Sequence, residues 1–473
     1  MRRLLWTAAL AGAAVLATTT DASAVPSFAR QTGMTCNQCH VSFGAPVPNF
    51  TFTGKKFRMN GYRMPFVAEK IESGEPGVAN GKRLAMPLIP YLSFRYQSQF
   101  AAQSKAAASP TDTDPEASPI SSNPTNRLSF FPGGALGDNF GLWVELYLTP
   151  DGSATREWTL GLFSFDEFDL RMVKITDKNT FGLSFSNQSI REVSGFGPWP
   201  TITSNLSRGG FAGWSHPNRG NLFAYGFWGD RLLTVVGASP GDDNLEWDKR
   251  NYQAQLAYAL KNSDENELWI NVMTQFGNDA IPIVSNTQPN AQRTWTYTDV
   301  VSGIRQTRGS TTATQLAYLS SDIGDFMRVE PELRYSFIDR GPHSVEMAGR
   351  FVIAREQYAD NSEAKQNNIG AAVRYMFDRT WGGDILLTRN LDFTLTDPQG
   401  REHSIETGTS WTAYAKYQPA MNFILNLQVG NSVRGVLDSP NAAACASTPG
   451  VSGCNGASPT KGWSWSLGAD ILF

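Results

Sequence analysis

The sequence predicts an all-β fold: a transmembrane antiparallel β-barrel of the outer-membrane type, with about 16 strands. From about residue 88 to the end of the 473-residue chain, apolar and polar residues alternate in segments separated by turns and polar loops. In such a barrel the apolar face meets lipid and the polar face lines the lumen. Charged residues make up only 18% of the chain, fewer than a soluble surface usually carries, and 43 glycines suit many turns. The alternative is a soluble antiparallel sheet whose apolar face is turned inward.

Individual segments show this alternation. Residues 251–260 and 422–428 each set apolar side chains against mostly polar ones. The last segment, 463–473, is apolar on one face and ends on Phe473, which resembles the signal that outer-membrane barrels present to their assembly machinery. In residues 328–337 one face carries Val329, Pro331, Leu333, Tyr335 and Phe337, and the other carries Arg328, Glu330, Glu332, Arg334 and Ser336.

The number of strands follows from parity. The pattern offers about seventeen candidate segments, but a bacterial barrel with both ends in the periplasm needs an even number. Residues 311–320 fit a strand least well, so we assign them to a long loop over 278–323, which leaves about sixteen strands. Long outer loops are expected at 101–126, 189–219, 278–323 and 433–461, and short periplasmic links at 134–139, 176–179 and 418–421.

The N-terminus carries an export signal. Arg2 and Arg3 precede an apolar stretch over 4–16, and residues 22–24 read Ala-Ser-Ala, so residues 1–24 form a signal peptide and the mature chain begins at Val25. No later stretch approaches the roughly 18 apolar residues of a transmembrane helix. The formal net charge of −3 implies no general attraction to nucleic acid.

Twelve residues after the cleavage site, Cys36, Cys39 and His40 form the pattern C-x-x-C-H, the attachment signature of haem c. The two cysteines would form thioethers to one haem, and His40 would be the proximal iron ligand. A zinc site would need more ligands, and the chain has only four cysteines and four histidines, the others far away. A redox dithiol would need a βαβ context that is missing here.

The chain therefore divides into a haem c segment over 25–82 and a barrel over 83–473. The small segment buries too little apolar surface to be stable alone, so we expect the covalent haem to staple it and the barrel lumen to hold it as a plug. Cys445 and Cys454 lie in the last predicted outer loop, where a disulfide is expected in an oxidising compartment. A redox role for this pair is the alternative.

Two stretches of the N-terminal segment resemble a known family. Residues 26–40 read PSFARQTGMTCNQCH, and residues 54–62 read GKKFRMNGY. Both are similar to the fused cytochrome–porins of iron-oxidising bacteria, and residues 131–141 resemble the first barrel hairpin of that family. The likeness is looser over 44–53 and only architectural beyond about residue 150.

The resemblance implies an outer-membrane electron-transfer protein, an Fe(II)-oxidising cytochrome. Its single haem c would pass electrons from extracellular Fe(II), or another external donor, to a periplasmic acceptor such as a cytochrome or a copper protein. The lipid of the outer membrane would surround the barrel, and the N-terminal segment would lie on the periplasmic or lumen side. Two alternatives remain: a solute porin with a structural haem plug, and a periplasmic cytochrome fused to a soluble β-domain.

The distal iron ligand is open at this stage. A thioether would raise the haem potential relative to a second imidazole, which suits an acceptor of electrons from Fe(II). We favour Met64, then Met59, because both flank a turn at Gly61 that can fold back over the haem; each could equally be core filler. His343, on a predicted periplasmic turn, is a further candidate.

Overall fold

The computed structural model describes most of the barrel and the core of the N-terminal segment. No helix among the described residues is both long and apolar enough to cross a membrane. The described residues are 28, 32, 34, 36–42, 49–64, 92–103, 121–148, 159–160, 163–196, 220–240, 250–263, 265–279, 295–298, 305–308, 323–338, 342–358, 363–378, 380–396, 402–406, 409–420, 423–433, 436–437 and 461–472.

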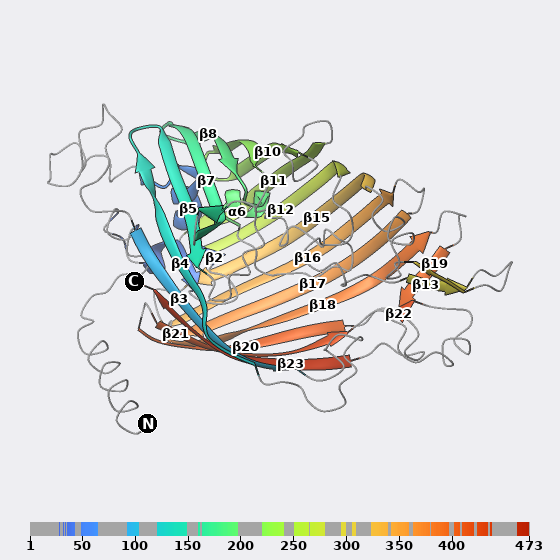
Figure 1. The fold of residues 1–473 in the computed structure, drawn as a ribbon. Coiled ribbons are helices and arrows are strands. Elements are labelled where there is room, and N and C mark those ends of the chain that lie inside the picture. Colours follow the sequence, from blue (N-terminus) through green and yellow to red (C-terminus); the bar gives the residue numbers. More distant parts are fainter. Residues whose placement is uncertain are drawn as a thin grey trace, which may run out of the picture.

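The barrel is closed, antiparallel and built, within the described part of the chain, from sixteen long strands with short extensions β6 (Thr159–Leu160), β19 (Glu402–Glu406) and β22 (Val436–Leu437) (Figure 1). The predicted fold class is confirmed. The last strand pairs with the first, which closes the barrel. The long strands are β3 (Leu92–Gln103), β4 (Ser121–Leu136), β5 (Phe140–Leu148), β7 (Phe163–Ile175), β8 (Asn179–Ser186), β9 (Asn221–Trp228), β10 (Leu232–Pro240), β11 (Arg250–Ser263), β12 (Asn266–Asp279), β15 (Ile323–Ile338), β16 (His343–Tyr358), β17 (Glu363–Phe377), β18 (Trp381–Thr396), β20 (Thr409–Ala420), β21 (Phe423–Val433) and β23 (Lys461–Leu472).

The side chains alternate across the wall as the sequence predicts. In β15 the polar residues from Arg328 to Ser336 are buried on the luminal side, whereas Leu333 is 53% exposed on the outside. Leu256 in β11 and Leu467 in β23 are likewise exposed. A soluble barrel would bury these side chains, so the apolar outer face indicates a lipid environment.

The two ends of the barrel differ. Tight turns join β4 to β5, β7 to β8, β9 to β10, β11 to β12, β17 to β18 and β20 to β21 at one end, and most connections at the other end are long. One long connection contains the hairpin β13 (Trp295–Thr298) and β14 (Arg305–Arg308), which the sequence analysis missed. Residues 402–406 and 409–420 form two separate strands, β19 and the wall strand β20, which both pair with β18. Residues 311–320, Phe473, Cys445 and Cys454 lie outside the described residues.

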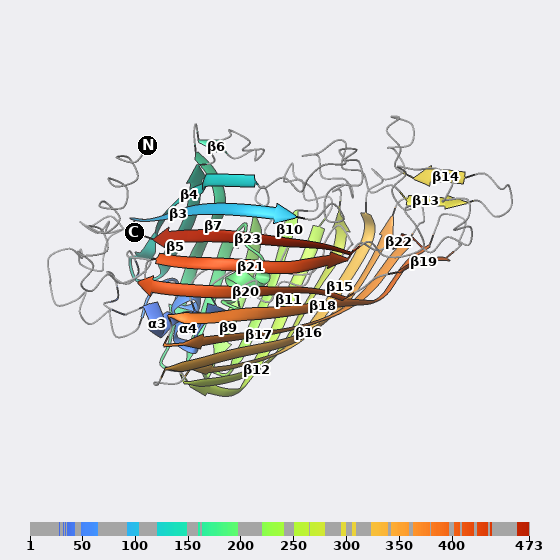
Figure 2. The same cartoon turned by 90° about the horizontal axis from the view of Figure 1, so that it is seen from below.

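The N-terminal segment lies at the end of the barrel that carries the short turns (Figure 2). It consists of α3 (Cys36–Cys39), the hairpin of β1 (His40–Ser42) and β2 (Asn49–Phe50), and α4 (Phe52–Met59). Thr51 caps α4, because its hydroxyl accepts from the backbone N–H of Gly54 at 3.1 Å. The helix ends where Gly61 and Tyr62 adopt positive φ angles of 69° and 61°, which turns the chain sharply.

A second segment, residues 187–196, also folds inside the barrel. It contains α6 (Ile190–Val193), which begins with a capping box between Ser189 and Glu192. Ile190, Val193 and Phe196 are fully buried against the wall, so the first part of the loop predicted over 189–219 folds into the barrel instead of lying outside. The sequence does carry a signal for this inward fold, because the apolar residues Ile190, Val193 and Phe196 follow or flank a capping box. A solvated loop would need neither feature.

Candidate functional site

The C-x-x-C-H segment is fixed onto the start of α4. The Thr51 hydroxyl donates to the carbonyl of Gln38 at 2.6 Å, and the Thr51 backbone N–H donates to the carbonyl of Cys39 at 3.0 Å. Gly54 lies so close that a Cβ there would stand 2.1 Å from the Cys39 carbonyl oxygen. Only glycine permits this contact, so α4 presses directly on the turn that carries the two cysteines.

An apolar cluster surrounds the second cysteine. Cys39 packs against buried Met34, Phe57, Tyr62 and Met64, and it forms no disulfide within the described chain. Trp143 of β5 joins the cluster from the barrel wall. The aromatic members stack: Phe28 lies 5.6 Å from Tyr62 and 5.5 Å from Trp143, between ring centroids.

His40 follows Cys39 and packs against Phe50. Its ring centroid is 4.9 Å from that of Phe50, its partner across the β1–β2 hairpin. Burial, reinforced by the positive charge of Arg58, lowers the pKa of His40 to about 4. The imidazole is therefore neutral at physiological pH, which is the form that coordinates a metal.

Arg58 of α4 is the cation that acts on His40. Its guanidinium carbon lies 5.7 Å from the centroid of the Phe50 ring, and the residue is only 9% exposed. It donates to the side-chain oxygen of Gln188 in the inward-folded segment and lies 3.9 Å from Asp169. Its Nε–H is buried and finds no hydrogen-bond acceptor among the described residues. A buried N–H of this kind fits an anionic group absent from the protein chain.

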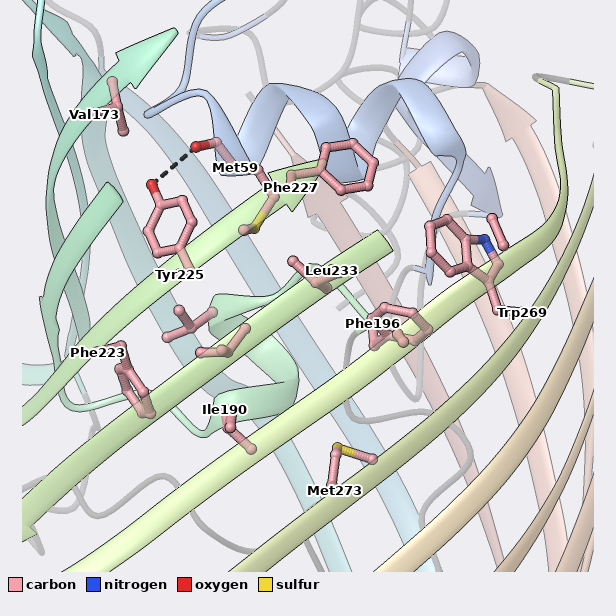
Figure 3. Close-up of a cluster of buried hydrophobic side chains, with 14 residues drawn as sticks. Met59, Val173, Ile190, Phe196, Phe223, Tyr225, Phe227, Leu233, Trp269 and Met273 are labelled. Carbon is pink, nitrogen blue, oxygen red and sulfur yellow. Dashed lines mark hydrogen bonds between the residues drawn. The ribbon is translucent and has the colours of Figure 1, made fainter. Parts of the chain in front are cut away.

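The same helix is bound to the wall by a series of polar contacts. Lys55 forms a buried ion pair of 2.7 Å with Glu267 of β12. The carbonyl of Met59 accepts from the Tyr225 hydroxyl of β9 at 2.8 Å (Figure 3). Asn60 accepts from the Thr180 hydroxyl of β8 at 2.6 Å, and Arg63 donates to the carbonyls of the β4–β5 turn region.

Asp169 of β7 is the central acceptor of this interface. It accepts from the Tyr62 hydroxyl at 2.6 Å, from Ser184 at 2.6 Å and from Arg171 Nε at 2.7 Å. Arg171 also donates to the carbonyls of Arg58 and Val193, so one side chain holds both inward-folded segments. Burial raises the pKa of Tyr62, which keeps its phenol protonated as the donor to Asp169.

The two candidate methionine ligands lie in different environments. Met59 is 1% exposed within the core between α4, α6 and the wall, and Arg171 approaches its sulfur at 3.8 Å (Figure 3). Met64 is 6% exposed and belongs to the cluster that contacts Cys39. His343 is exposed at the barrel rim, where its Nδ1 lies 2.8 Å from the Tyr375 hydroxyl.

The residues fit a covalently attached haem c. A neutral, half-buried imidazole follows a cysteine pair on one helical turn, an apolar cluster borders the second cysteine, and a buried guanidinium N–H remains for a carboxylate such as a haem propionate. No group of three or more His, Cys, Asp or Glu residues in the described ranges is arranged to hold a separate metal ion.

Sequence reasoning found the cysteine pair and the motif 54–62 but missed the wall residues that receive them. The motif 54–62 carried a usable signal, because its glycines and aromatic residues exceed what a solvated helix requires. In the structure, Gly54 and Phe57 face the C-x-x-C-H turn, whereas Lys55, Arg58 and Tyr62 contact the wall. Nothing in the sequence distinguishes their partners from the other alternating polar residues of the strands. These partners are Asp169, Arg171, Tyr225 and Glu267.

Comparison with known proteins concerns the barrel alone. No protein-family model and no curated protein matches the chain. Among solved structures, OmpT of Vibrio cholerae is 10% identical with a TM-score of 0.42, covering 81% of this chain and 97% of its own. The outer membrane channel DcaP of Acinetobacter baumannii (10%, TM-score 0.45, coverage 81% and 97%) and OprB of Pseudomonas putida (10%, TM-score 0.46, coverage 81% and 94%) are similar in the same way. At these values the likeness adds nothing to the fold that the strand pairing shows.

Proposed function

We propose that this protein is an outer-membrane electron-transfer protein with one covalent haem c at the short-turn end of its barrel. It takes electrons from an extracellular donor, for which the family resemblance suggests Fe(II), and passes them to a periplasmic acceptor. The observation that carries the proposal is the C-x-x-C-H turn held against α4, which is itself bound to the wall by buried polar contacts. A cysteine pair without such a role would not need this support.

Each residue of the C-x-x-C-H turn would have its own role in holding the haem. Cys36 and Cys39 would hold the haem, and His40 would ligate its iron from one side. The bound haem would supply a one-electron couple at its iron. α4 keeps His40 in place through Thr51 and Gly54, and Phe57 and Tyr62 exclude water from the side of Cys39. Met64, which packs in the cluster that contacts Cys39, is our favoured distal ligand over Met59.

The location of the segment at the short-turn end supports delivery of the electrons to a periplasmic acceptor. Bacterial barrels place short turns in the periplasm and long loops outside, so the haem would lie close to the periplasmic acceptor. β15 and β16 have 16 residues each, about 50 Å of extended strand. An electron does not cross that length in one step, so the dissolved donor would enter the lumen from the loop end.

Reduction of the haem in its own membrane tests the proposal. Outer membranes containing the protein are challenged with Fe(II), and the ferrous-minus-ferric difference spectrum is followed. We expect the spectrum of a reduced c-type haem from the wild type and little of it from Cys39→Ala, which loses one thioether. A pyridine haemochrome spectrum of Cys39→Ala identical to the wild type would reject covalent haem.

The barrel fold also suits a solute porin whose N-terminal segment is only a plug. Swelling of liposomes that contain the purified protein separates the two functions. Rapid uptake of small sugars without Fe(II)-dependent haem reduction would favour the porin. Cell fractionation tests the remaining alternative, a periplasmic cytochrome fused to a soluble β-domain. Such a protein would be recovered from the periplasm rather than the outer membrane.

A further inference from the structure

The four basic residues of the segment that binds the barrel differ in how their charges are balanced. Lys55 is paired with Glu267 at 2.7 Å, and Lys56 is paired with Asp230 at 2.9 Å at the rim. Arg63 is half-buried and donates to backbone carbonyls. Arg58 alone of these four is buried without a carboxylate in direct contact, since Asp169 lies 3.9 Å away.

Asp169 is already occupied by another cation. Arg171 approaches it at 2.5 Å and 2.7 Å through two nitrogens, and the phenol of Tyr62 and the hydroxyl of Ser184 donate to the same carboxylate. The charges of Arg58, Asp169 and Arg171 therefore sum to one positive charge, which would face a haem propionate as well as the carboxyls of Glu167 and Glu192. The direct partner of Arg58 is the neutral Gln188, whose amide separates it from Glu167.

The charge of Arg58 acts on the predicted proximal ligand His40, and both side chains contact Phe50. Arg58 is 5.7 Å from the Phe50 ring, and the ring of His40 is 4.9 Å from the same phenylalanine. A positive charge disfavours a further positive charge nearby, and ferric haem carries one more than ferrous haem. Burial matters here, because water would screen the same charge at the surface.

We propose that Arg58 is a positioning residue for electron uptake that raises the midpoint potential of the haem held by His40. The proposal rests on the proposed function, because it requires the haem. One electron leaves the donor, which is oxidised from Fe(II) to Fe(III), and one electron reduces ferric haem to ferrous haem; no proton is transferred. By stabilising the ferrous form, Arg58 makes the transfer from a weak reductant such as Fe(II) more favourable.

The test is a potentiometric titration of the full-length protein, monitored by the haem spectrum. Arg58→Gln removes the charge, Arg58→Lys keeps it, and Lys56→Gln removes a rim charge two residues away as a matched control. Coulomb's law at the effective dielectric of a protein interior gives a change on the order of tenfold in the ferrous-to-ferric ratio at a fixed potential. We expect the ferrous-to-ferric ratio to fall by this factor in Arg58→Gln, to return to the wild-type value in Arg58→Lys and to stay unchanged in Lys56→Gln.

A second variant covers the case in which Arg58→Gln does not accumulate. Gln188→Glu leaves Arg58 in place and adds a negative charge at its guanidinium, so it should shift the ratio in the same direction. Equal potentials for wild type, Arg58→Gln and Gln188→Glu, with haem bound in each, would overturn the role of Arg58 and leave the proposed function intact. A wild type without covalent haem would overturn both.

Discussion

Two parts of the luminal wall use their polar residues differently. The socket wall, formed by Asp169, Arg171, Thr180, Tyr225 and Glu267, directs its polar groups at the N-terminal segment. On the self-paired wall, formed by Arg374, Asp384 and Lys416, the polar groups bond across neighbouring strands, with Asp384 at 2.9 Å from both cations. The same alternating pattern thus builds either a binding surface or a self-contained ion cluster, according to where the partner charge lies.

Loss of a buried carboxylate on each wall gives the sharpest comparison. Asp169→Asn removes the carboxylate paired with buried Arg171, and Asp384→Asn removes the one paired with buried Arg374 and Lys416. Breaking a buried pair costs about 3–5 kcal/mol. Both variants should unfold at lower urea concentration than the wild type. Only Asp169→Asn should release the N-terminal segment, because only Asp169 holds Tyr62.

Limited proteolysis of folded barrels measures that difference. Cleavage within residues 49–64 should accelerate in Asp169→Asn and stay at the wild-type rate in Asp384→Asn, while heat-modifiable mobility on gels reports that both barrels are folded. Equal protection of the segment in the two variants would mean that the socket wall does not hold it.

Sequence alone predicted the alternating faces of the strands but neither of these two arrangements of polar groups. Period-two alternation is a local property, so the strands and their inward and outward faces could be read from short windows, as in β15. The socket depends on contacts between residues 107 positions apart for Tyr62 and Asp169, and 212 apart for Lys55 and Glu267. A single sequence carries no record of such pairs. The inward fold of residues 187–196 was missed for the same reason, since its partners Glu330 and Glu332 lie on distant β15.

The two methionines distinguish the part of the N-terminal segment that packs on the socket wall from the part that packs in the apolar cluster around Cys39. Met59→Ala removes a side chain buried against the socket wall and should destabilise its docking by about 2–5 kcal/mol. Met64→Ala should instead lower the midpoint potential and remove any weak thioether-to-iron band of the oxidised spectrum. Spectra and proteolysis of both variants check this. A band that is lost in Met59→Ala and kept in Met64→Ala would reverse the assignment of the distal ligand.

Close backbone contact gives a smaller effect. A Cβ on Gly141 of β5 would stand 2.2 Å from the Gly61 carbonyl oxygen, whereas one on Gly349 of β16 meets no atom within 4 Å. Gly141→Ala should therefore push the segment from the wall and cost about 1–3 kcal/mol, as overpacking does elsewhere. Gly349→Ala is the matched control and should leave proteolytic protection unchanged. Equal protection in the two variants would show that the contact is easily relieved.

The smallest expected effect concerns one hydroxyl of the socket wall. Tyr225 donates to the Met59 carbonyl at 2.8 Å in a buried setting, while Tyr375 meets His343 at the exposed rim. Tyr225→Phe leaves that carbonyl without its donor, and a neutral buried hydrogen bond contributes about 1 kcal/mol, roughly a fivefold change in the open fraction of the segment. Tyr375→Phe loses a bond that water replaces, so its segment should be cleaved at the wild-type rate. Faster cleavage in Tyr375→Phe than in Tyr225→Phe would contradict this prediction. It would mean that the Met59 carbonyl does not need the Tyr225 hydroxyl as its donor and that contacts other than those with β9 hold the segment.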